Sequence, residues 1–287
     1  MERVVGNQNS GVLYVVATPI GNLQDISARA LQVLQQADLI AAEDTRHSAR
    51  LLEHFGIRTP MVACHEHNER DGSGVRVERL LAGENLALIS DAGTPLVSDP
   101  GFRLVRGARE AGIQVVPVPG ACAAIAALSA AGLPSDRFAF EGFLPAKSTA
   151  RGKRLQELSG ESRTLIFYEA PHRVLECVMD MAQAFGPLRK AVLARELTKA
   201  FETIHDAPLG ELAAWIAADS NQQRGECVLL VEGVDDKAER DVVDVESQRV
   251  LMLLAAELPL KKAAALTAQI TGARKNLLYQ WGLEQGR

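Results

Sequence analysis

Val12-Leu-Tyr-Val-Val-Ala17 is an apolar run rich in β-branched residues, and Thr18-Pro-Ile-Gly-Asn22 follows it directly. The run predicts a buried strand, and the segment with the proline and glycine predicts a loop. Apolar residues then recur at helical spacing from Ile26 to Leu34, which predicts a helix. Because an α/β fold is a series of such units, this stretch decides the fold if the pattern recurs.

The same pattern recurs along the next hundred residues. Further strands are predicted at 39–42, 86–89 and 115–118, and further helices at 51–55, 102–111 and 121–133. Strands that alternate with helices form a mostly parallel, doubly wound sheet with helices on both faces. Residues 11–134 are therefore expected to form an N-terminal α/β domain.

A second α/β domain is expected at residues 135–240. Its predicted elements are an extended segment at 137–143, helices at 147–158, 174–185 and 209–217, and strands at 164–168, 191–196 and 227–232. The polar residues 233–237 predict a linker, and residues 241–287 predict two or three helices. A length of 287 residues suits two domains with a small helical appendage.

Composition narrows the class of protein. Hydrophobic residues at 47% and charged residues at 23% exclude disordered, collagen-like and coiled-coil chains. Four widely spaced cysteines without a CxxC pair predict reduced thiols in a cytoplasmic protein. Residues 115–134 carry no charge, but Pro117, Pro119 and Gly120 break them, so we expect no membrane segment. A net charge of −5 argues against a polycation that coats nucleic acid nonspecifically.

In open α/β sheets, ligands bind in the loops at the carboxyl ends of the strands. The first loop lacks the GxGxxG pattern, which argues against a nicotinamide dinucleotide. Ser90-Asp-Ala-Gly-Thr-Pro95 and Ser98-Asp-Pro-Gly101 place small residues beside two carboxylates, where a flat ligand could lie against the backbone. The alternative for both segments is an Asx-turn with a helix cap. In Cys64-His-Glu-His67, adjacent side chains cannot all face one ion, so we predict no metal.

Two regions could contact nucleic acid. Between Arg137 and Arg154, five basic residues stand against one acidic residue. In the tail, apolar spacing before and after Gly272 predicts helix, turn and helix, the order found in a helix-turn-helix. The alternative for the tail is a small packing or dimerisation appendage.

Six long motifs occur in a fixed order along the chain. They are Tyr14-Val-Val-Ala-Thr-Pro-Ile-Gly-Asn-Leu-Gln-Asp25, Ala42-Glu-Asp-Thr-Arg46, Ser90-Asp-Ala-Gly-Thr-Pro-Leu-Val-Ser-Asp-Pro-Gly101, Phe167-Tyr-Glu-Ala-Pro-His-Arg173, Arg195-Glu-Leu-Thr-Lys199 and Gly225-Glu-Cys-Val-Leu-Leu-Val-Glu-Gly233. Together they resemble the ribosomal RNA small subunit methyltransferase I family of the tetrapyrrole (corrin/porphyrin) methylase superfamily. The resemblance extends from Leu13 to Tyr279.

The resemblance implies methyl transfer from S-adenosylmethionine to the ribose 2′-hydroxyl of a cytidine in the decoding region of 16S ribosomal RNA, within the small ribosomal subunit. It also implies a homodimer, with the methyl donor in a cleft between two α/β domains. The implied cofactor-binding residues are Pro19, Gly21, Asp91, Ala92, Gly93, Thr94, Pro95, Ser98, Asp99, Pro119, Gly120, Ala121, Cys122, Tyr168, Glu169, Ala170, Arg195, Leu197 and Thr198.

A ribose hydroxyl needs a base to take its proton, so we expect a carboxylate or histidine at the mouth of the cleft. The expected catalytic residues are Glu43, Asp44, His47 and Glu169, with His172 as a further choice. The expected RNA-binding residues are Arg46, Lys147, Arg151, Lys153, Arg154, Arg173, Lys261, Lys262, Arg274 and Lys275. For each of them the alternative is a structural ion pair.

Three alternatives to methyl transfer onto RNA stay open at this point. The same cleft could methylate a small tetrapyrrole or a protein side chain. A ribosome-binding factor could keep the fold without the chemistry. Many tetrapyrrole methylases have a glycine-rich first loop with an aspartate, where this chain has Ala17-Thr-Pro-Ile-Gly-Asn22, so a corrinoid or porphyrin acceptor is less expected.

Overall fold

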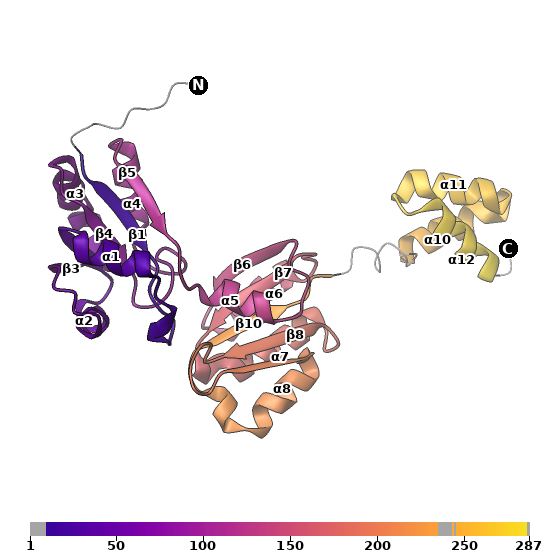
Figure 1. Cartoon of the computed structure of the whole chain (residues 1–287). Helices are drawn as coiled ribbons and strands as arrows, with labels where there is room; N and C mark the ends of the chain where they lie inside the picture. Colours follow the sequence, from indigo (N-terminus) through magenta and orange to yellow (C-terminus); the bar gives the residue numbers. More distant parts are fainter. Residues whose placement is uncertain (1–9, 235–242, 244, 286–287) are drawn as a thin grey trace. The chain divides into compact units, whose positions relative to one another are not determined.

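The computed structural model describes residues 10–234, 243 and 245–285 (Figure 1). Within these residues, the chain up to Leu158 together with Thr164–Glu232 forms one compact unit. Ser159–Arg163 and the described residues from Gly233 onward form a second unit. The predicted domain boundaries at 134 and 240 stay predictions. No helix in the described part of the chain is long and apolar enough to cross a membrane.

The first sheet is fully parallel, as the alternating pattern predicts. Its strands are β1 (Val12–Val16), β2 (Leu39–Ala42), β3 (Met61–Ala63), β4 (Leu86–Ile89) and β5 (Gln114–Val118). The strand order is β3-β2-β4-β1-β5, and each neighbouring pair is parallel. β5 tolerates Pro117 because it is an edge strand, where a missing N–H costs no ladder hydrogen bond.

Helices cover both faces of this sheet. They are α1 (Ala28–Gln36), α2 (Thr45–His54), α3 (Glu66–Leu81) and α4 (Phe102–Glu110), with a short 3-10 helix η1 (Leu23–Asp25). In β4, Leu86 and Leu88 belong to the apolar cluster of α3 and α4, whereas Ala87 and Ile89 belong to that of α1 and α2. Successive residues of a strand point to opposite faces, so one fully apolar strand serves both layers.

The second sheet is mixed. Its strands are β6 (Phe138–Phe143), β7 (Thr164–Glu169), β8 (Lys190–Arg195), β9 (Thr203–Pro208) and β10 (Cys227–Val231). The order is β6-β7-β10-β8-β9; only β6 and β7 pair in parallel, and β10 runs antiparallel to β7 and β8. The start of the central strand β10 therefore lies beside the ends of its two neighbours.

Three helices cover one face of the second sheet and one helix covers the other. The elements are α5 (Ala123–Ala130), α6 (Ser148–Leu158), α7 (Val174–Phe185) and α8 (Leu209–Ala218), with 3-10 helices η2 (Pro171–Arg173) and η3 (Ser220–Gln223). Residues of α6, α7 and α8 pack in one apolar cluster. Ala124, Ala127 and Leu128 of α5 pack in another, which also contains Ile20 from the loop after β1.

The C-terminal unit contains α10 (Val245–Glu257), α11 (Leu260–Thr271) and α12 (Lys275–Glu284), shown in yellow in Figure 1. The predicted helix, turn and helix is confirmed: α11 ends at Gly272, whose φ of +78° is the left-handed conformation typical of a helix C-terminus. A Cβ added at Gly282 would lie 2.5 Å from a Leu260 methyl group, so α12 passes close to α11 there. Leu251 and Leu278 are fully buried in this unit's own core.

Three elements are not predicted from the sequence. β3 has only three residues, which is too short for a periodic signal. α3 contains Asp71-Gly-Ser-Gly74, and its glycines weaken a helical pattern. β9 is an edge strand whose residues alternate between partly buried and exposed positions, so it lacks the apolar run of a central strand.

Arg151 differs from the sequence-based expectation of an exposed RNA contact. Its side chain is 2% exposed, and its guanidinium lies 2.6 Å from Asp180 and 3.6 Å from Glu176, both on α7. A buried guanidinium must be paired because desolvation penalises an isolated charge. Arg151 therefore ties α6 to α7 and does not belong to the basic surface.

We predict that Arg151→Ala lowers the free energy of unfolding by about 3 kcal/mol, because it leaves Asp180 without its cation. Urea denaturation followed by circular dichroism measures this change. Lys153→Ala, on an exposed position of the same helix, is the matched control and should change stability by less than about 0.5 kcal/mol. Equal stability of the two variants would show that the buried ion pair does not tie the helices together.

Candidate functional site

The loops at the strand ends enclose two adjoining cavities. The first, cavity A, encloses about 360 Å³, within the size range of small-molecule sites. It is lined by Ile20, Ala92, Gly93, Thr94, Val97, Ser98, Asp99, Cys122, Ala123, Phe143, Tyr168, Glu169, Ala170, Pro171, Glu226, Cys227 and Val228. Most of these residues are small or apolar, and none of them is cationic.

The second, cavity B, encloses about 500 Å³ and shares Ile20, Ala92 and Glu226 with cavity A. It is lined by Thr18, Pro19, Ile20, Gly21, Leu23, His47, Ser48, Arg50, Leu51, Ser90, Asp91, Ala92, Lys199 and Glu226. Arg50 and Lys199 give it two cationic side chains, and His47 adds an imidazole. Cavity B also contains the carboxylates of Asp91 and Glu226, so the two cavities differ in that cavity B has cationic side chains and cavity A has none.

Backbone hydrogen bonds join the loops that form both cavities. The Thr18 and Gly93 peptide groups bond each other in both directions, at 2.9 and 3.1 Å. Gly93 has a φ of +83°, a conformation in which a side chain would be strained. The Thr94 hydroxyl donates to the Ala121 carbonyl at 2.9 Å. These hydrogen bonds connect the end of β1, the end of β4 and the start of α5. We call the connected segments, which contain Thr18, Gly93, Thr94 and Ala121, the rim.

Three carboxylates converge on this rim. The Asp91 amide donates to Glu43 Oε2 at 3.2 Å, and the Asp44 amide donates to Asp91 Oδ1 at 3.0 Å. Burial, together with the negative charges of Glu43 and Asp91, raises the pKa of Asp99 to about 6, although a hydrogen bond with Ser90 lowers it. Burial also raises the pKa of Glu43. A carboxyl group with a pKa near 6 suits proton transfer at neutral pH.

The four expected catalytic residues lie in different settings. Glu43 belongs to the carboxylate group just described, and His47 lines cavity B. Asp44 caps α2, and hydrogen bonds from Arg46 lower its pKa, so it is a weak base. Glu169 lines cavity A, but its carboxylate accepts from the Ala170 amide at 2.8 Å and pairs with Arg173 at 3.3 Å.

The structure brings most of the expected cofactor residues together at the two cavities. Those that line cavity A are Ala92, Gly93, Thr94, Ser98, Asp99, Cys122, Tyr168, Glu169 and Ala170. Pro19, Gly21 and Asp91 line cavity B. The expected residues outside both linings are Pro95, Pro119, Gly120, Ala121, Arg195, Leu197 and Thr198. Several of these have structural roles: a Cβ at Gly120 would lie 2.8 Å from that of Ala17, so a close backbone approach requires glycine there.

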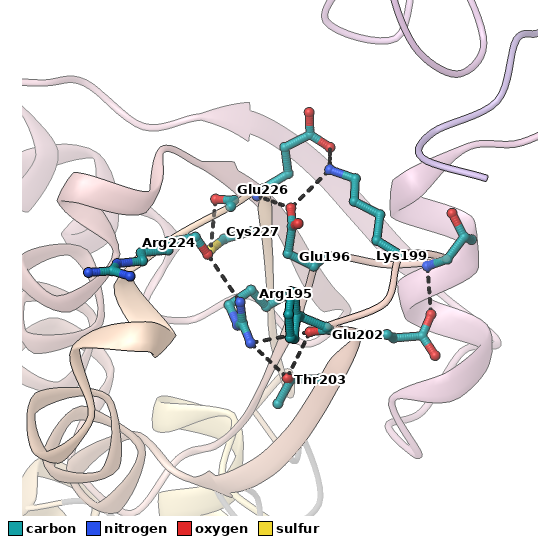
Figure 2. Close-up of polar contacts among 11 residues, drawn as sticks. Arg195, Glu196, Lys199, Glu202, Thr203, Arg224, Glu226 and Cys227 are labelled. Atoms are coloured by element: carbon teal, nitrogen blue, oxygen red, sulfur yellow. Dashed lines mark hydrogen bonds and ion pairs between the residues drawn. The ribbon is translucent and has the colours of Figure 1, made fainter. Parts of the chain in front are cut away.

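Arg195 organises the loops around the second sheet (Figure 2). It is 8% exposed, and its guanidinium donates to the Phe201 carbonyl, to Thr203 Oγ1 and to the Arg224 carbonyl, at 3.2, 3.0 and 3.4 Å. Its donors are directed at the protein and not at a cavity. Leu197 lies in the apolar cluster with Ile20, and the Thr198 amide donates to Glu202 at 2.6 Å.

The expected RNA-binding residues differ in exposure and in their bonds. The exposed ones are Arg46, Lys147, Lys153, Arg154, Lys261, Lys262, Arg274 and Lys275. Arg46 bonds Asp44, Arg154 bonds Glu141 and Glu157, and the less exposed Arg173 bonds the Leu144 carbonyl and Glu169. The positive surface between Arg137 and Arg154 is consequently smaller than the sequence suggests.

Several lining residues are not predicted from the sequence. Glu226, Cys227 and Val228 lie at the start of β10. Candidate sites in the sequence are sought in the loops that follow strands, so these three residues are not among them. They reach the cavity because β10 is antiparallel: Cys227 pairs with Glu169 on one side and with Arg195 on the other. The motif Gly225-Glu-Cys-Val228 is the sequence signal that points to them. In the part of the chain that the structure describes, no three His, Cys, Asp or Glu side chains are arranged so that they could hold one metal ion.

Comparison with known proteins shows what the fold is similar to. The family model described as Tetrapyrrole (Corrin/Porphyrin) Methylases matches residues 12–213. A crystal structure of the methyltransferase CobJ is 21% identical, with a TM-score of 0.58, over 78% of this chain and 95% of that one. A crystal structure of diphthine synthase is 18% identical, with a TM-score of 0.58, over 78% and 90%. These likenesses show a shared methylase fold.

Closer relatives extend along nearly the whole chain. Ribosomal RNA small subunit methyltransferase I of Pseudomonas aeruginosa is 66% identical over 96% of this chain and 98% of its own. The protein of the same name from Escherichia coli O157:H7 is 58% identical over 97% of both. Residues 241–286 match the model described as RsmI C-terminal HTH domain. The chain therefore belongs to the tetrapyrrole methylases and, within them, to the ribosomal RNA small subunit methyltransferase I family.

Tyr168 of β7 bonds the start of α5 at cavity A. Its hydroxyl accepts from the Ala124 amide at 3.1 Å, near the start of α5, where Cys122 provides no side-chain cap. Burial raises the pKa of Tyr168, so the hydroxyl stays neutral. Its ring makes edge contacts with Phe140 and Phe143, at centroid distances of 4.8 and 5.8 Å.

We predict that Tyr168→Phe lowers the free energy of unfolding by about 1 kcal/mol, because the Ala124 amide loses its acceptor while the ring contacts stay. Chemical denaturation measures the change. Tyr279→Phe, at a partly exposed position of α12, is the control and should have no measurable effect. A Tyr168→Phe variant as stable as the wild type would contradict a capping role for the hydroxyl.

Proposed function

We propose that this protein transfers a methyl group from S-adenosylmethionine to 16S ribosomal RNA of the small ribosomal subunit. The names of its relatives support the acceptor. The proposed acceptor group is the one that the family resemblance implies, the ribose 2′-hydroxyl of a cytidine in the decoding region. The observation that carries the proposal is that a cavity without cationic side chains adjoins a second cavity that contains Arg50 and Lys199.

The lining of cavity A fits the proposed donor. Asp99 and Glu226 provide negative charge for a sulfonium, and Ala92, Gly93 and Cys122 allow a flat adenine to approach the backbone. When bound, S-adenosylmethionine supplies a methyl group that is already activated for transfer. A crystal structure of uroporphyrin-III C-methyltransferase from Thermus thermophilus, with a TM-score of 0.53, is a complex of that enzyme with S-adenosyl homocysteine. This likeness agrees with a donor site in the fold.

We place proton removal on Asp99, supported by Glu43. Of the three carboxylates that line cavity A, Asp99 is the one on which the charges of Glu43 and of the cavity B residue Asp91 act. The chain's task is then to hold the acceptor hydroxyl close to the methyl group and to take its proton at the Asp99 carboxylate. Glu169 and Asp44 serve this purpose less well because Arg173 and Arg46 already hold their oxygens.

The exposed cations are proposed to hold the RNA backbone. Lys147 and Lys153 lie at α6, and the four exposed cations of the C-terminal unit lie at the first turns of α11 and α12. Phosphate contacts of this kind position an RNA without reading its sequence. As the resemblance implies, we also propose a homodimer. We further propose that it is cytoplasmic, as the reduced cysteines predict, and that it acts on the assembled small subunit. Methylation of a tetrapyrrole or a protein side chain is less well supported by the relatives' names.

The proposed function is tested by transfer of a labelled methyl group from S-adenosylmethionine to small ribosomal subunits from a strain that lacks this methylation. Nuclease digestion and mass spectrometry locate the label. We expect a single 2′-O-methylcytidine in the decoding region. Bound donor without label on RNA would refute the acceptor, and a tetrapyrrole or a ribosomal protein added to the assay would then be tested. Equal transfer to deproteinised RNA would exclude the assembled subunit as the required substrate.

We predict that kcat/KM for methyl transfer rises with pH through about 6, because Asp99 accepts a proton only when it is ionised. Asp99→Asn should lower kcat/KM by about 10²-fold or more and remove this acid limb. Glu43→Gln should move the limb to lower pH, since it removes a negative charge that raises the pKa of Asp99.

Asp25→Asn, at an exposed carboxylate outside both cavity linings, is the control for this experiment. Its pH profile should equal that of the wild type. An Asp99→Asn enzyme that keeps the acid limb near pH 6 would assign proton removal to another group.

A further inference from the structure

Lys199 lies between two carboxylates at the wall of cavity B (Figure 2). Its Nζ is 2.9 Å from Glu196 Oε1 and 3.0 Å from Glu226 Oε2. Burial opposes the charge of Lys199, but hydrogen bonds to these carboxylates outweigh it and raise the pKa of the lysine. The ammonium is therefore permanently charged at neutral pH.

The inner carboxylate, Glu196, is fixed in place. Its Oε1 accepts from the Glu226 amide at 2.9 Å, and its side chain is 18% exposed. A Cβ added at Gly225 would lie 2.4 Å from Glu196 Cδ, so the glycine leaves the space that this carboxylate occupies. Burial would raise the pKa of Glu196, but the hydrogen bonds from Lys199 and the Glu226 amide lower it.

The outer carboxylate, Glu226, is held much less firmly. Its side chain is 73% exposed, and the only contact that Figure 2 draws to its carboxylate is the one with Lys199. An ion pair in such an exposed setting contributes little to stability and is easily exchanged. The partner on the solvent side of Lys199 is thus replaceable, whereas the partner on the protein side is not.

The stem of Lys199 is aligned by the first loop. A Cβ added at Gly21 would lie 2.5 Å from Lys199 Cγ and 2.7 Å from Cε. The aliphatic chain therefore lies directly over Gly21, and the absence of a side chain there sets its path. Gly21 and Glu196 together hold the ammonium at cavity B, next to the rim that carries Asp91.

We propose that Lys199 binds a phosphate group of the acceptor RNA at cavity B. In the absence of RNA, Glu226 pairs with the Lys199 ammonium, and the phosphate then replaces Glu226 as its partner. This inference rests on the proposed function. Glu196 is the positioning residue because it keeps the ammonium in place when the outer partner changes. A lysine ammonium has three donors, so it can bond a phosphate oxygen while keeping Glu196. Glu226 then competes with RNA and lowers its affinity.

The alternative to competition with RNA is a structural role, in which the ion pair between Lys199 and Glu226 only holds two loops together. The two roles predict opposite signs for Glu226→Gln. If Glu226 competes with phosphate, neutralising it strengthens RNA binding. If the pair is structural, neutralising it weakens binding and stability together.

The test compares Lys199→Gln, Glu226→Gln and the double variant with the full-length wild type. Filter binding measures the affinity for small ribosomal subunits at several salt concentrations, and calorimetry measures the affinity for S-adenosylmethionine. For Lys199→Gln we expect weaker subunit binding, a salt slope reduced by about 0.7 to 0.9, and unchanged donor affinity. For Glu226→Gln we expect subunit binding tightened severalfold, and in the Lys199→Gln background this gain should vanish. Arg224→Gln, at an exposed cation nearby that does not line cavity B, should leave the salt slope within error of the wild type.

The proposal is overturned if Glu226→Gln weakens binding, or if Lys199→Gln lowers the unfolding midpoint and donor affinity while the salt slope stays the same. Glu196→Gln adds a readout for positioning, since it should weaken subunit binding in the same direction as Lys199→Gln while the salt slope is largely kept. Methyl transfer by the wild type is measured in the same preparations. Absence of that transfer would refute the proposed function, whereas transfer with an unchanged salt slope in Lys199→Gln would refute only this inference.

Discussion

The site depends on the burial of Ile20, the middle residue of the first loop. It is 7% exposed and belongs to the apolar cluster of α5 and the second sheet, although it follows the first strand of the first sheet. Burying such a side chain contributes about 2 kcal/mol. Ile20 lines both cavities, so the contact that fixes the loop also fixes how the two cavities adjoin. The paired peptide groups of Thr18 and Gly93 then extend this fixed point to the loop after β4.

The direction of β10 has a comparable effect on the charge of the site. In a fully parallel sheet only strand ends reach the ligand, and these are the loops that a sequence search examines. Because β10 is antiparallel, its first residues lie there as well, and Glu226 becomes part of both cavities. One carboxylate thus lines a cavity without cationic side chains and also pairs with the lysine of the adjoining cavity.

Much of this arrangement is predictable from sequence, for identifiable reasons. Long apolar runs alternating with helical spacing predict the parallel sheet, because a strand buried on both faces is apolar at every position, as Leu86 to Ile89 are. The loop carboxylate Asp99 is predicted as a ligand-binding residue because small residues surround it, but not as a base. The burial of Arg151 is not predicted, because its partner Asp180 is distant in the sequence. The place of Glu226 in the site is not predicted either, because the direction of β10 leaves no local signal in the sequence. Motif resemblance supplies the chemistry that periodicity cannot.

Backbone strain is concentrated where the charges are held. Among the described residues, the non-glycine residues with positive φ are Leu96, Ser98, Glu196 and Thr198. All four lie in the two loops that carry Asp99 and Lys199. Such conformations cost about 1 to 3 kcal/mol each and persist only where surrounding contacts determine them. The loop of Lys199 has those contacts in the Glu226 amide and in Glu202, which accepts from the Thr198 amide. The strained backbone therefore holds Asp99 and Lys199 at adjoining cavities, whereas a relaxed loop would leave their side chains free to turn toward solvent.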